Sequence, residues 1–438
     1  MGSFVPTTPS ERQQMLKTIG VGSVEELFRD VPQEMRIDGY LDLPSGKSEM
    51  ETLESVSALA EKNHVFRTCL RGAGSYRHYI PAAVKAIVNR EEFVTAYTPY
   101  QAEISQGILQ AIFEYQTMLC ELTGMDVSNA CVYDGGTAAA ESITMCRDRK
   151  RTKAYVSATT DPQVIEVMKT YCFGSDVELT VVPQKDGWTD PEALRSLLGQ
   201  DAACFYVQQP NFYGLLEEAE LLGEITHAAG AKYVMGVNPI SLAILKTPAE
   251  CGADVAVGEG QPLGLDTAFG GPYLGFMTAS SAMMRKLPGR IVGQTVDTEG
   301  EIGYVLTLSA REQHIRREKA SSNICSNEQL CAFTAAVYLS TMGEKGLRQA
   351  ATLCTSKAHY FAQQLEEKLG WKRVHPGEFF HEFVTECPDT EKALAALAKR
   401  DILGGLPVES GILWCVTEVV TKERLDEAVA ILQEVSCG

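Results

Sequence analysis

Apolar and polar positions alternate in regular blocks through the middle of the chain. Between residues 153 and 279, short apolar runs of strand length are separated by stretches with helical spacing of apolar positions. The predicted strands are AYVSA, VELTVV, ACFYVQ, KYVMGV, DVAVG and YLGFMT, and the helices between them include DPQVIEVMKTY, DPEALRSLL and LEEAELLGEITHAAG. This alternation is typical of a mostly parallel sheet with helices on both faces. Ligands bind such sheets outside the carboxyl ends of the strands.

Helical signals flank this region on both sides. Residues 106–123 predict one long helix that is capped by Ser105 and ended by the glycine that follows. Residues 326–369 predict one or two helices, with a break at Gly343 and Gly346. The last part, from HEFVTEC to KERLDEAVAILQEV, mixes strand and helix patterns. The predicted fold class is therefore α/β, with a mostly parallel sheet in a large domain and a smaller C-terminal α+β domain.

The first 75 residues carry short helical signals and no clear strand. Ser10 precedes ERQQMLKTIG, and Ser23 precedes VEELFRDV with an acidic residue three positions later. Serine at such positions is typical of a helix N-cap. We therefore expect a helical arm over 1–75, a large α/β domain over 76–325, and linking helices with the small domain over 326–438.

Composition narrows the classes of function. The 438 residues include 39 Lys and Arg against 57 Asp and Glu, which gives a formal net charge of -18. Nucleic acids and anionic membranes attract basic surfaces, so neither partner is expected. The 13 cysteines form no CxxC pair and most lie in apolar runs, which favours the reducing cytoplasm. The polar N-terminus lacks a signal-peptide pattern, and no apolar run is long enough for a membrane span.

Three stretches are candidates for binding, each with a plainer alternative. YDGGTAAAES places the turn Gly135-Gly136-Thr137 at a helix start, which suits an anion or serves only close packing. TAYTPYQAEISQG is rich in aromatic and polar groups, as in an interface loop or a solvated helix start. REQHIRREKASSNIC gathers arginines that either contact an anion or a partner or face solvent.

The sequence shows no self-contained catalytic constellation. The seven histidines are dispersed, and no Cys/His spacing or aspartate cluster predicts a metal site. GADVAVGEGQPLG (252–264) leads from a predicted strand into a glycine-rich loop, where a catalytic side chain is expected. That loop offers only Glu259 and Gln261.

These stretches together resemble the glycine decarboxylase P-proteins, and within them the α subunit (subunit 1) of the split bacterial form. The resemblance covers nearly the whole chain and rests on TAYTPYQAEISQG, CELTGM, YDGGTAAAES, GGPYLGF, LPGRIVG and REQHIRREKASSNIC. It implies fold type I of the pyridoxal-phosphate-dependent transferases, which is the aspartate-aminotransferase-like fold. That expectation agrees with the sheet pattern.

The same resemblance predicts that the cofactor-binding groups are missing. Active family members hold pyridoxal phosphate with a Schiff-base lysine and pair its pyridine nitrogen with an acid. The acid lies in a strand like YVDGAN, and the lysine lies in a stretch like DVSHLNLHK. Here Met235 stands at the position of the acid and Pro262 at the position of the lysine. We therefore expect no catalytic residue and no cofactor-binding residue in this chain; the lack of a ligand pattern noted above likewise predicts no metal.

The resemblance implies an active site that is shared with a β subunit, which carries the lysine and the pyridoxal phosphate, in an α₂β₂ assembly. The expected reaction decarboxylates glycine, releases CO2 and transfers the aminomethyl group to the lipoyl group of H-protein, and the chain alone is expected to be inactive. The candidates for the shared site or the interface are Thr98, Tyr100, Gln101, Glu103, Ser105, Arg316 and Arg317.

Two other functions remain open. The chain could be a non-catalytic scaffold or regulator that binds the β subunit or the lipoyl carrier. It could instead be a stand-alone pyridoxal phosphate lyase or transaminase that uses another lysine. Thr355-Ser356-Lys357 resembles such a lysine motif, but it falls in a helical run rather than after a strand.

Overall fold

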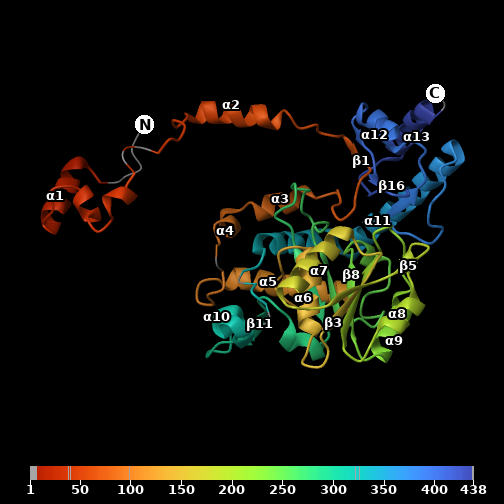
Figure 1. Cartoon of the computed structure of the whole chain (residues 1–438), viewed down its shortest axis with the longest axis horizontal. Helices are drawn as coiled ribbons and strands as arrows, with labels where there is room; N and C mark the ends of the chain where they lie inside the picture. Colours follow the sequence, from red (N-terminus) through yellow and green to blue (C-terminus); the bar gives the residue numbers. More distant parts are fainter. Residues whose placement is uncertain are drawn as a thin grey trace. The chain divides into compact units, whose positions relative to one another are not determined.

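The computed structural model describes residues 7–37, 39, 41–97, 99–320, 322–324 and 326–436. The chain forms two units, Met1–His64 and Val65–Gly438, and each is described by itself (Figure 1). The expected domain boundaries at 75/76 and 325/326 stay a prediction.

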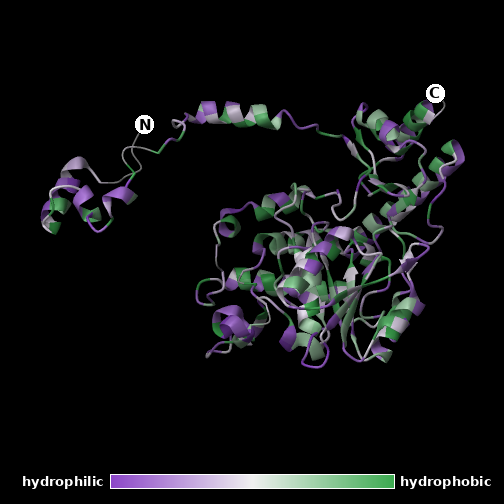
Figure 2. Ribbon diagram, viewed as in Figure 1, coloured by the Kyte–Doolittle hydropathy of each residue, from purple (hydrophilic) through white to green (hydrophobic). Residues whose placement is uncertain are grey.

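The first unit is helical and has almost no core of its own. It contains α1 (Pro9–Ile19), η1 (Glu25–Phe28), η2 (Gln33–Met35) and α2 (Glu49–Ala60). In its described part Leu16 is the single buried side chain. Figure 2 shows hydrophobic as well as hydrophilic residues along α2, where Met50, Leu53, Val56 and Leu59 recur at helical spacing and are all exposed. The apolar face of α2 is therefore not packed against other described residues of its own unit.

The second unit is built on a seven-stranded sheet with the order β2-β10-β9-β8-β7-β3-β4. The run from β9 to β4 is parallel, whereas β10 and β2 are antiparallel at one edge. The strands are β2 (Val127–Ser128), β3 (Lys153–Ser157), β4 (Leu179–Val182), β7 (Ala202–Gln209), β8 (Lys232–Val237), β9 (Val255–Glu259) and β10 (Gly275–Ala279). The mostly parallel sheet expected from the sequence is confirmed.

Helices cover both faces of this sheet. Side chains alternate along β7, so that Phe205 packs in one layer and Tyr206 in the other. The Phe205 layer contains α5, α8, α9 and part of α11, and the Tyr206 layer contains α6 and α7. Their bounds are α5 (Gln106–Thr123), α6 (Gly135–Cys146), α7 (Pro162–Gly174), α8 (Pro191–Leu197), α9 (Ala219–Ala228) and α11 (Gln329–Leu369).

Shorter elements connect these layers. Helical segments are α3 (Ala82–Val88), α4 (Glu91–Val94), η3 (Ser241–Ala243), η4 (Ser281–Lys286), η5 (Ser309–Arg311), α10 (Gln313–Arg316) and η6 (Arg317–Lys319). Two antiparallel hairpins pair β5 (Gln184–Lys185) with β6 (Trp188–Thr189) and β11 (Val292–Val296) with β12 (Ile302–Leu306).

The C-terminal part is an α+β layer, as expected. Its antiparallel sheet has the order β13-β16-β15 and packs with α12, α13 and the end of α11 around the buried Trp414. The elements are β13 (Glu382–Thr385), α12 (Thr390–Ala398), β14 (Ile402–Leu403), β15 (Leu406–Val408), β16 (Gly411–Cys415) and α13 (Lys422–Ser436). Helix α11 has non-helical backbone angles at Gly343, which confirms the predicted break there.

Several local expectations need correction. Helix α1 is capped by Thr8 in a capping box with Glu11, not by Ser10. Ser23 precedes only the single 3₁₀ turn η1. Within 1–75, β1 (Thr68–Cys69) forms a short strand that pairs with β14, because the chain there runs alongside the C-terminal part.

Ser105 stands at the N-cap of α5, but its side chain makes no capping hydrogen bond. Gln106 ties this end of the helix to β12 instead. Its side-chain amide donates to Tyr304 O at 2.9 Å, and its side-chain oxygen accepts from Tyr304 N at 2.8 Å.

Two further features concern the cysteines and the possibility of a membrane-spanning helix. The eleven cysteines in the described residues are all free, and most are buried. None of the described helices combines the length and the apolarity that a bilayer crossing needs.

Candidate functional site

A cavity of about 470 Å³ lies at the carboxyl ends of the parallel strands. Its walls come from the ends of β7, β8 and β9, from the first residues of α6 and α7, and from two segments outside the sheet, residues 73–76 and the start of β13. Open α/β sheets bind ligands at this edge, so the cavity occupies the expected place for an active site.

The positions assigned to the missing lysine and acid differ in their surroundings. Pro262 lines the cavity, as expected of a residue that follows β9. Met235 is fully buried in the Phe205 layer and is not among the lining residues. Neither side chain offers an amine or a carboxylate. Lys357 of the alternative motif lies inside α11, where its amino group donates to Glu418 O at 2.6 Å.

Gln261 closes the loop after β9 onto the segment 73–76. Its side-chain oxygen accepts from Tyr76 N at 2.9 Å, and its amide donates to Tyr76 O at 2.9 Å and to Leu265 O at 2.7 Å. The side chain therefore pairs with a backbone as a neighbouring strand would, which fixes one wall of the cavity.

In the glycine turn at the start of α6, the N–H groups of Gly135 and Thr137 donate to carboxylates of the same chain. Gly135 N donates to the Glu259 carboxylate at 2.9 Å, and Thr137 N donates to the Asp134 carboxylate at 2.7 Å. Two further backbone groups, Gln261 N at 2.9 Å and Leu274 N at 3.0 Å, also donate to Glu259. Loss of water around the carboxylate raises the pKa of Glu259 to about 6 in spite of these three donors.

The cavity is acidic. Its lining contains four carboxyl groups, and none of the described lining residues is a lysine or an arginine. Burial raises the pKa of Glu382 to about 7 and also raises the pKa of Asp161. Burial lowers the pKa of His381 well below its ordinary value, so this imidazole is neutral at physiological pH. The carboxyl groups are Asp134, Asp161, Glu259 and Glu382.

The Glu382 carboxyl group connects the C-terminal part to the segment 73–76. It accepts from Ala73 N at 2.7 Å and from the Tyr76 hydroxyl at 2.8 Å. Because Glu382 begins β13, this contact joins residues that are more than 300 positions apart in the sequence.

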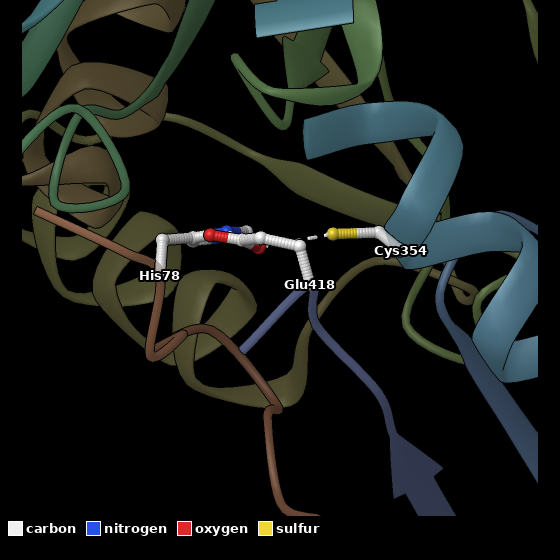
Figure 3. Close-up of side chains that lie close together, drawn as sticks. All are labelled: His78, Cys354 and Glu418. Atoms are coloured by element: carbon white, nitrogen blue, oxygen red, sulfur yellow. Dashed lines mark hydrogen bonds and ion pairs between the residues drawn. The ribbon is translucent and has the colours of Figure 1, made fainter. Parts of the chain in front are cut away.

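Beyond the cavity wall, His78, Cys354 and Glu418 point toward one another (Figure 3). The Glu418 carboxylate is 2.7 Å from His78 Nδ1 and accepts from Cys354 Sγ at 3.3 Å. Its second oxygen accepts from Tyr79 N at 2.6 Å. These donors satisfy a buried carboxylate without a metal, whereas structural zinc sites normally use four ligands. We therefore describe this group as a hydrogen-bonded network and not as a metal site.

The predicted interface residues lie elsewhere. The Tyr100 hydroxyl donates to Asn327 Oδ1, and the Arg290 guanidinium lies 4.7 Å above the tyrosine ring. Arg290 also pairs with the buried Glu312 at 2.6 Å. Arg290 therefore links the loop around Tyr100 to the segment that carries Arg316 and Arg317, so two predicted stretches meet.

The remaining candidates are placed as follows. Gln101, Glu103, Arg316 and Arg317 are exposed, and Ser105 is partly buried. Thr98 lies outside the described residues. None of the described candidates lines the cavity.

Sequence reasoning missed the acids that shape the cavity. Glu259 was visible in the GEGQ loop, but nothing local showed that its carboxylate turns back to α6. Asp161, before Pro162, carries a sequence signal that could have been used, that of a helix N-cap, and its carboxylate accepts from Gln163 N at 2.8 Å. Glu382 and Tyr76 meet only through the tertiary fold.

Comparison with known proteins agrees with this architecture. The family model for the glycine cleavage system P-protein matches residues 2–432. A probable glycine dehydrogenase (decarboxylating) subunit 1 from Desulfitobacterium hafniense is 47% identical over 444 residues, covering 99% of this chain and 100% of its own.

Solved structures give the same result. A glycine decarboxylase (P-protein) of the glycine cleavage system, crystallised in an inhibitor-bound form, superposes with a TM-score of 0.92 at 41% identity, covering 99% of this chain and 100% of its own. An alanine–glyoxylate aminotransferase from Nostoc shares the fold, with a TM-score of 0.59 at 16% identity over 84% of this chain and 95% of its own. The fold is thus that of the fold type I, pyridoxal-phosphate-dependent enzymes, and the chain belongs to the glycine cleavage system P-protein family.

Proposed function

We propose that this chain is the subunit of glycine decarboxylase that anchors no cofactor. With a second subunit it decarboxylates glycine, releases CO2 and transfers the aminomethyl group to the lipoyl group of a carrier protein (H-protein). Its relatives support this proposal, because they bear the name subunit 1 and match it over their full length. The free thiols fit a cytoplasmic enzyme.

The lining of the cavity is the main support for a subunit that anchors no cofactor. Its residues do not fit pyridoxal phosphate, the cofactor that the fold family implies for the complex. A Schiff base needs a lysine amine, and Pro262 stands at the proposed position. A phosphate group needs donors or cations, but Glu259 already occupies Gly135 N, and the described lining offers no lysine or arginine. We therefore derive no catalytic step in this cavity and assign the cofactor to the second subunit.

The loop around Tyr100 and the segment with Arg316 and Arg317 are the proposed contact with that subunit. Tyr97, Ile104 and Ile315 in these stretches are 92%, 80% and 52% exposed, so the two stretches together bring three large apolar side chains to the surface. Aromatic residues and arginines are enriched at protein interfaces. Tyr100, Gln101, Glu103 and Ser105, with Arg316 and Arg317, line or support the shared active site in this proposal.

Reconstitution tests the function. The chain alone, the second subunit alone and their mixture are assayed for glycine-dependent exchange of labelled bicarbonate with a lipoylated carrier. We expect exchange only in the mixture, and the internal-aldimine absorbance only in samples that contain the second subunit. That absorbance in the isolated chain would contradict the proposal, and full activity of the second subunit alone would leave this chain a scaffold.

Replacing Tyr100 by alanine is expected to weaken the association of the two subunits by roughly 10- to 100-fold, as truncation of an aromatic interface residue does. The loss removes the ring under Arg290 and the hydrogen bond to Asn327 together. Titration of the variant against the second subunit, followed by the exchange activity, measures the change.

Two controls make this result specific. Tyr100→Phe keeps the ring and loses only the hydroxyl, so its effect should be smaller. Phe173→Ala removes another exposed aromatic ring, on α7, which is 90% exposed and is not part of the proposed interface. Equal effects of Tyr100→Ala and Phe173→Ala, or an unfolded Tyr100→Ala chain, would remove Tyr100 from the interface.

A further inference from the structure

Glu259 gathers three backbone donors that belong to three different segments. Gly135 N comes from the start of α6, Gln261 N from the loop after β9, and Leu274 N from the residue before β10. Convergent backbone N–H groups at a helix start form the usual protein site for a phosphate or carboxylate ion. Here the anion at such a site is a side chain of the protein itself.

The close packing at the start of α6 supports this interpretation. A Cβ atom at Gly135 would lie 2.9 Å from Glu259 Cβ and 3.0 Å from Glu259 N. Glycine is therefore required at this position because strand β9 approaches the helix start directly, and the Glu259 side chain has a short path to the Gly135 N–H. The helix has twelve residues, and its positive N-terminal end favours a negative charge at this point.

We propose that Glu259 acts as a built-in anion that closes the start of α6 to phosphorylated ligands. This inference rests on the proposed function and deepens it, because it names the residue that keeps this cavity from holding the cofactor that the second subunit holds. A phosphate ion would have to displace the carboxylate from three donors. It would also meet the other carboxyl groups of the cavity, and no described residue of the lining is a lysine or an arginine that could offset their charge.

The experiment removes the carboxylate and measures the binding of inorganic phosphate. Full-length wild-type chain and Glu259→Ser are titrated with phosphate and observed by ³¹P NMR and calorimetry at neutral pH. We expect no saturable binding to the wild type and at least roughly tenfold tighter binding to Glu259→Ser, since the freed N–H groups and the helix end become available. In a second titration, pyridoxal phosphate should also bind more tightly to Glu259→Ser than to the wild type.

The control is Glu382→Gln, compared with the wild type and Glu259→Ser at about pH 8, where a carboxyl group with a pKa of about 7 is mostly ionised. It then removes a negative charge from the same cavity but leaves the donors at α6 occupied. It should gain little phosphate affinity. An equal gain in phosphate affinity in both variants would show that the total charge of the cavity, and not Glu259 itself, limits phosphate binding. That result would overturn the proposal. Saturable binding to the wild type, or no gain in a folded Glu259→Ser chain, would also overturn it.

Folding is checked by near-ultraviolet circular dichroism, with Glu259→Gln as a second variant of nearly the same shape. Its amide can accept from two of the donors but opposes the third with an N–H group, so its gain should lie between those of the wild type and Glu259→Ser. Internal-aldimine absorbance in the wild-type chain would refute the proposed function itself. A cofactor-free wild type with no gain in the variants would refute only the role of Glu259.

Discussion

Replacing Gly214 by alanine is expected to prevent normal folding of the second unit, with a loss of at least about 4 kcal/mol in the free energy of unfolding. Gly214 has φ +84°, and a Cβ atom there would lie 1.8 Å from Glu382 O. The carbonyl belongs to the backbone at the start of β13, so it cannot move aside as a flexible side chain would. Thermal unfolding and the yield of soluble protein measure the effect.

Gly174 is the matched control for this substitution. It ends α7 and belongs to the same unit, and a Cβ atom there would meet no heavy atom within 4 Å. Gly174→Ala should leave stability unchanged or raise it by up to about 1 kcal/mol, because alanine favours the helix. Similar behaviour of Gly174→Ala and Gly214→Ala would contradict the steric argument.

Replacing Glu418 by alanine should lower the free energy of unfolding by about 3 kcal/mol, because each buried donor left without an acceptor costs about 1–3 kcal/mol. The substitution leaves His78, Cys354 and Tyr79 N without their common acceptor. Urea unfolding at neutral pH measures the loss. Glu409→Ala, in the exposed turn before β16, should change stability by less than about 0.5 kcal/mol and serves as the control.

The same substitution has an expected pH dependence. Burial alone would raise the pKa of Glu418, but the hydrogen bond and the charge of His78 and the N–H of Tyr79 outweigh it and lower the pKa below its ordinary value of 4.5. A lowered pKa contributes stability that is present above pH 4.5 and is lost as the pH falls through the folded-state value. The difference between wild type and Glu418→Ala should therefore shrink in acid, and a constant difference would contradict this origin.

The layered architecture could be predicted because it depends on local patterns. The strands of the central sheet from 153 to 279, the helices between them, the helix α5 and the break at Gly343 all follow from the spacing of apolar residues and from the placement of glycines. The hairpin of β5 and β6 in the same range was not predicted. Contacts between distant segments had no such signal. The pairing of β1 with β14 joins residues more than 330 positions apart, and a two-residue strand leaves no period to detect.

The candidate site could likewise be predicted only in part: its local turn was recognisable, but its long-range contacts were not. The glycine turn at α6 was visible in YDGGTAAAES, and its position at the sheet edge followed from the order of elements. Its occupation by Glu259 was not visible, because that contact depends on how closely β9 approaches the helix. The meeting of Tyr100 with Arg290 likewise joins two segments whose order in the sequence gives no hint of contact.

Burial of the cysteine thiols limits their reaction with the lipoyl disulfide that takes part in the proposed reaction. Burial raises the pKa of Cys120, Cys172 and Cys251 to about 11 and the pKa of Cys331 to about 12. Only a thiolate attacks a disulfide, so at neutral pH these sulfurs are nearly inert to exchange. In the proposed reaction, the lipoyl disulfide of the carrier would then react with the aminomethyl group without being trapped by these thiols as a mixed disulfide.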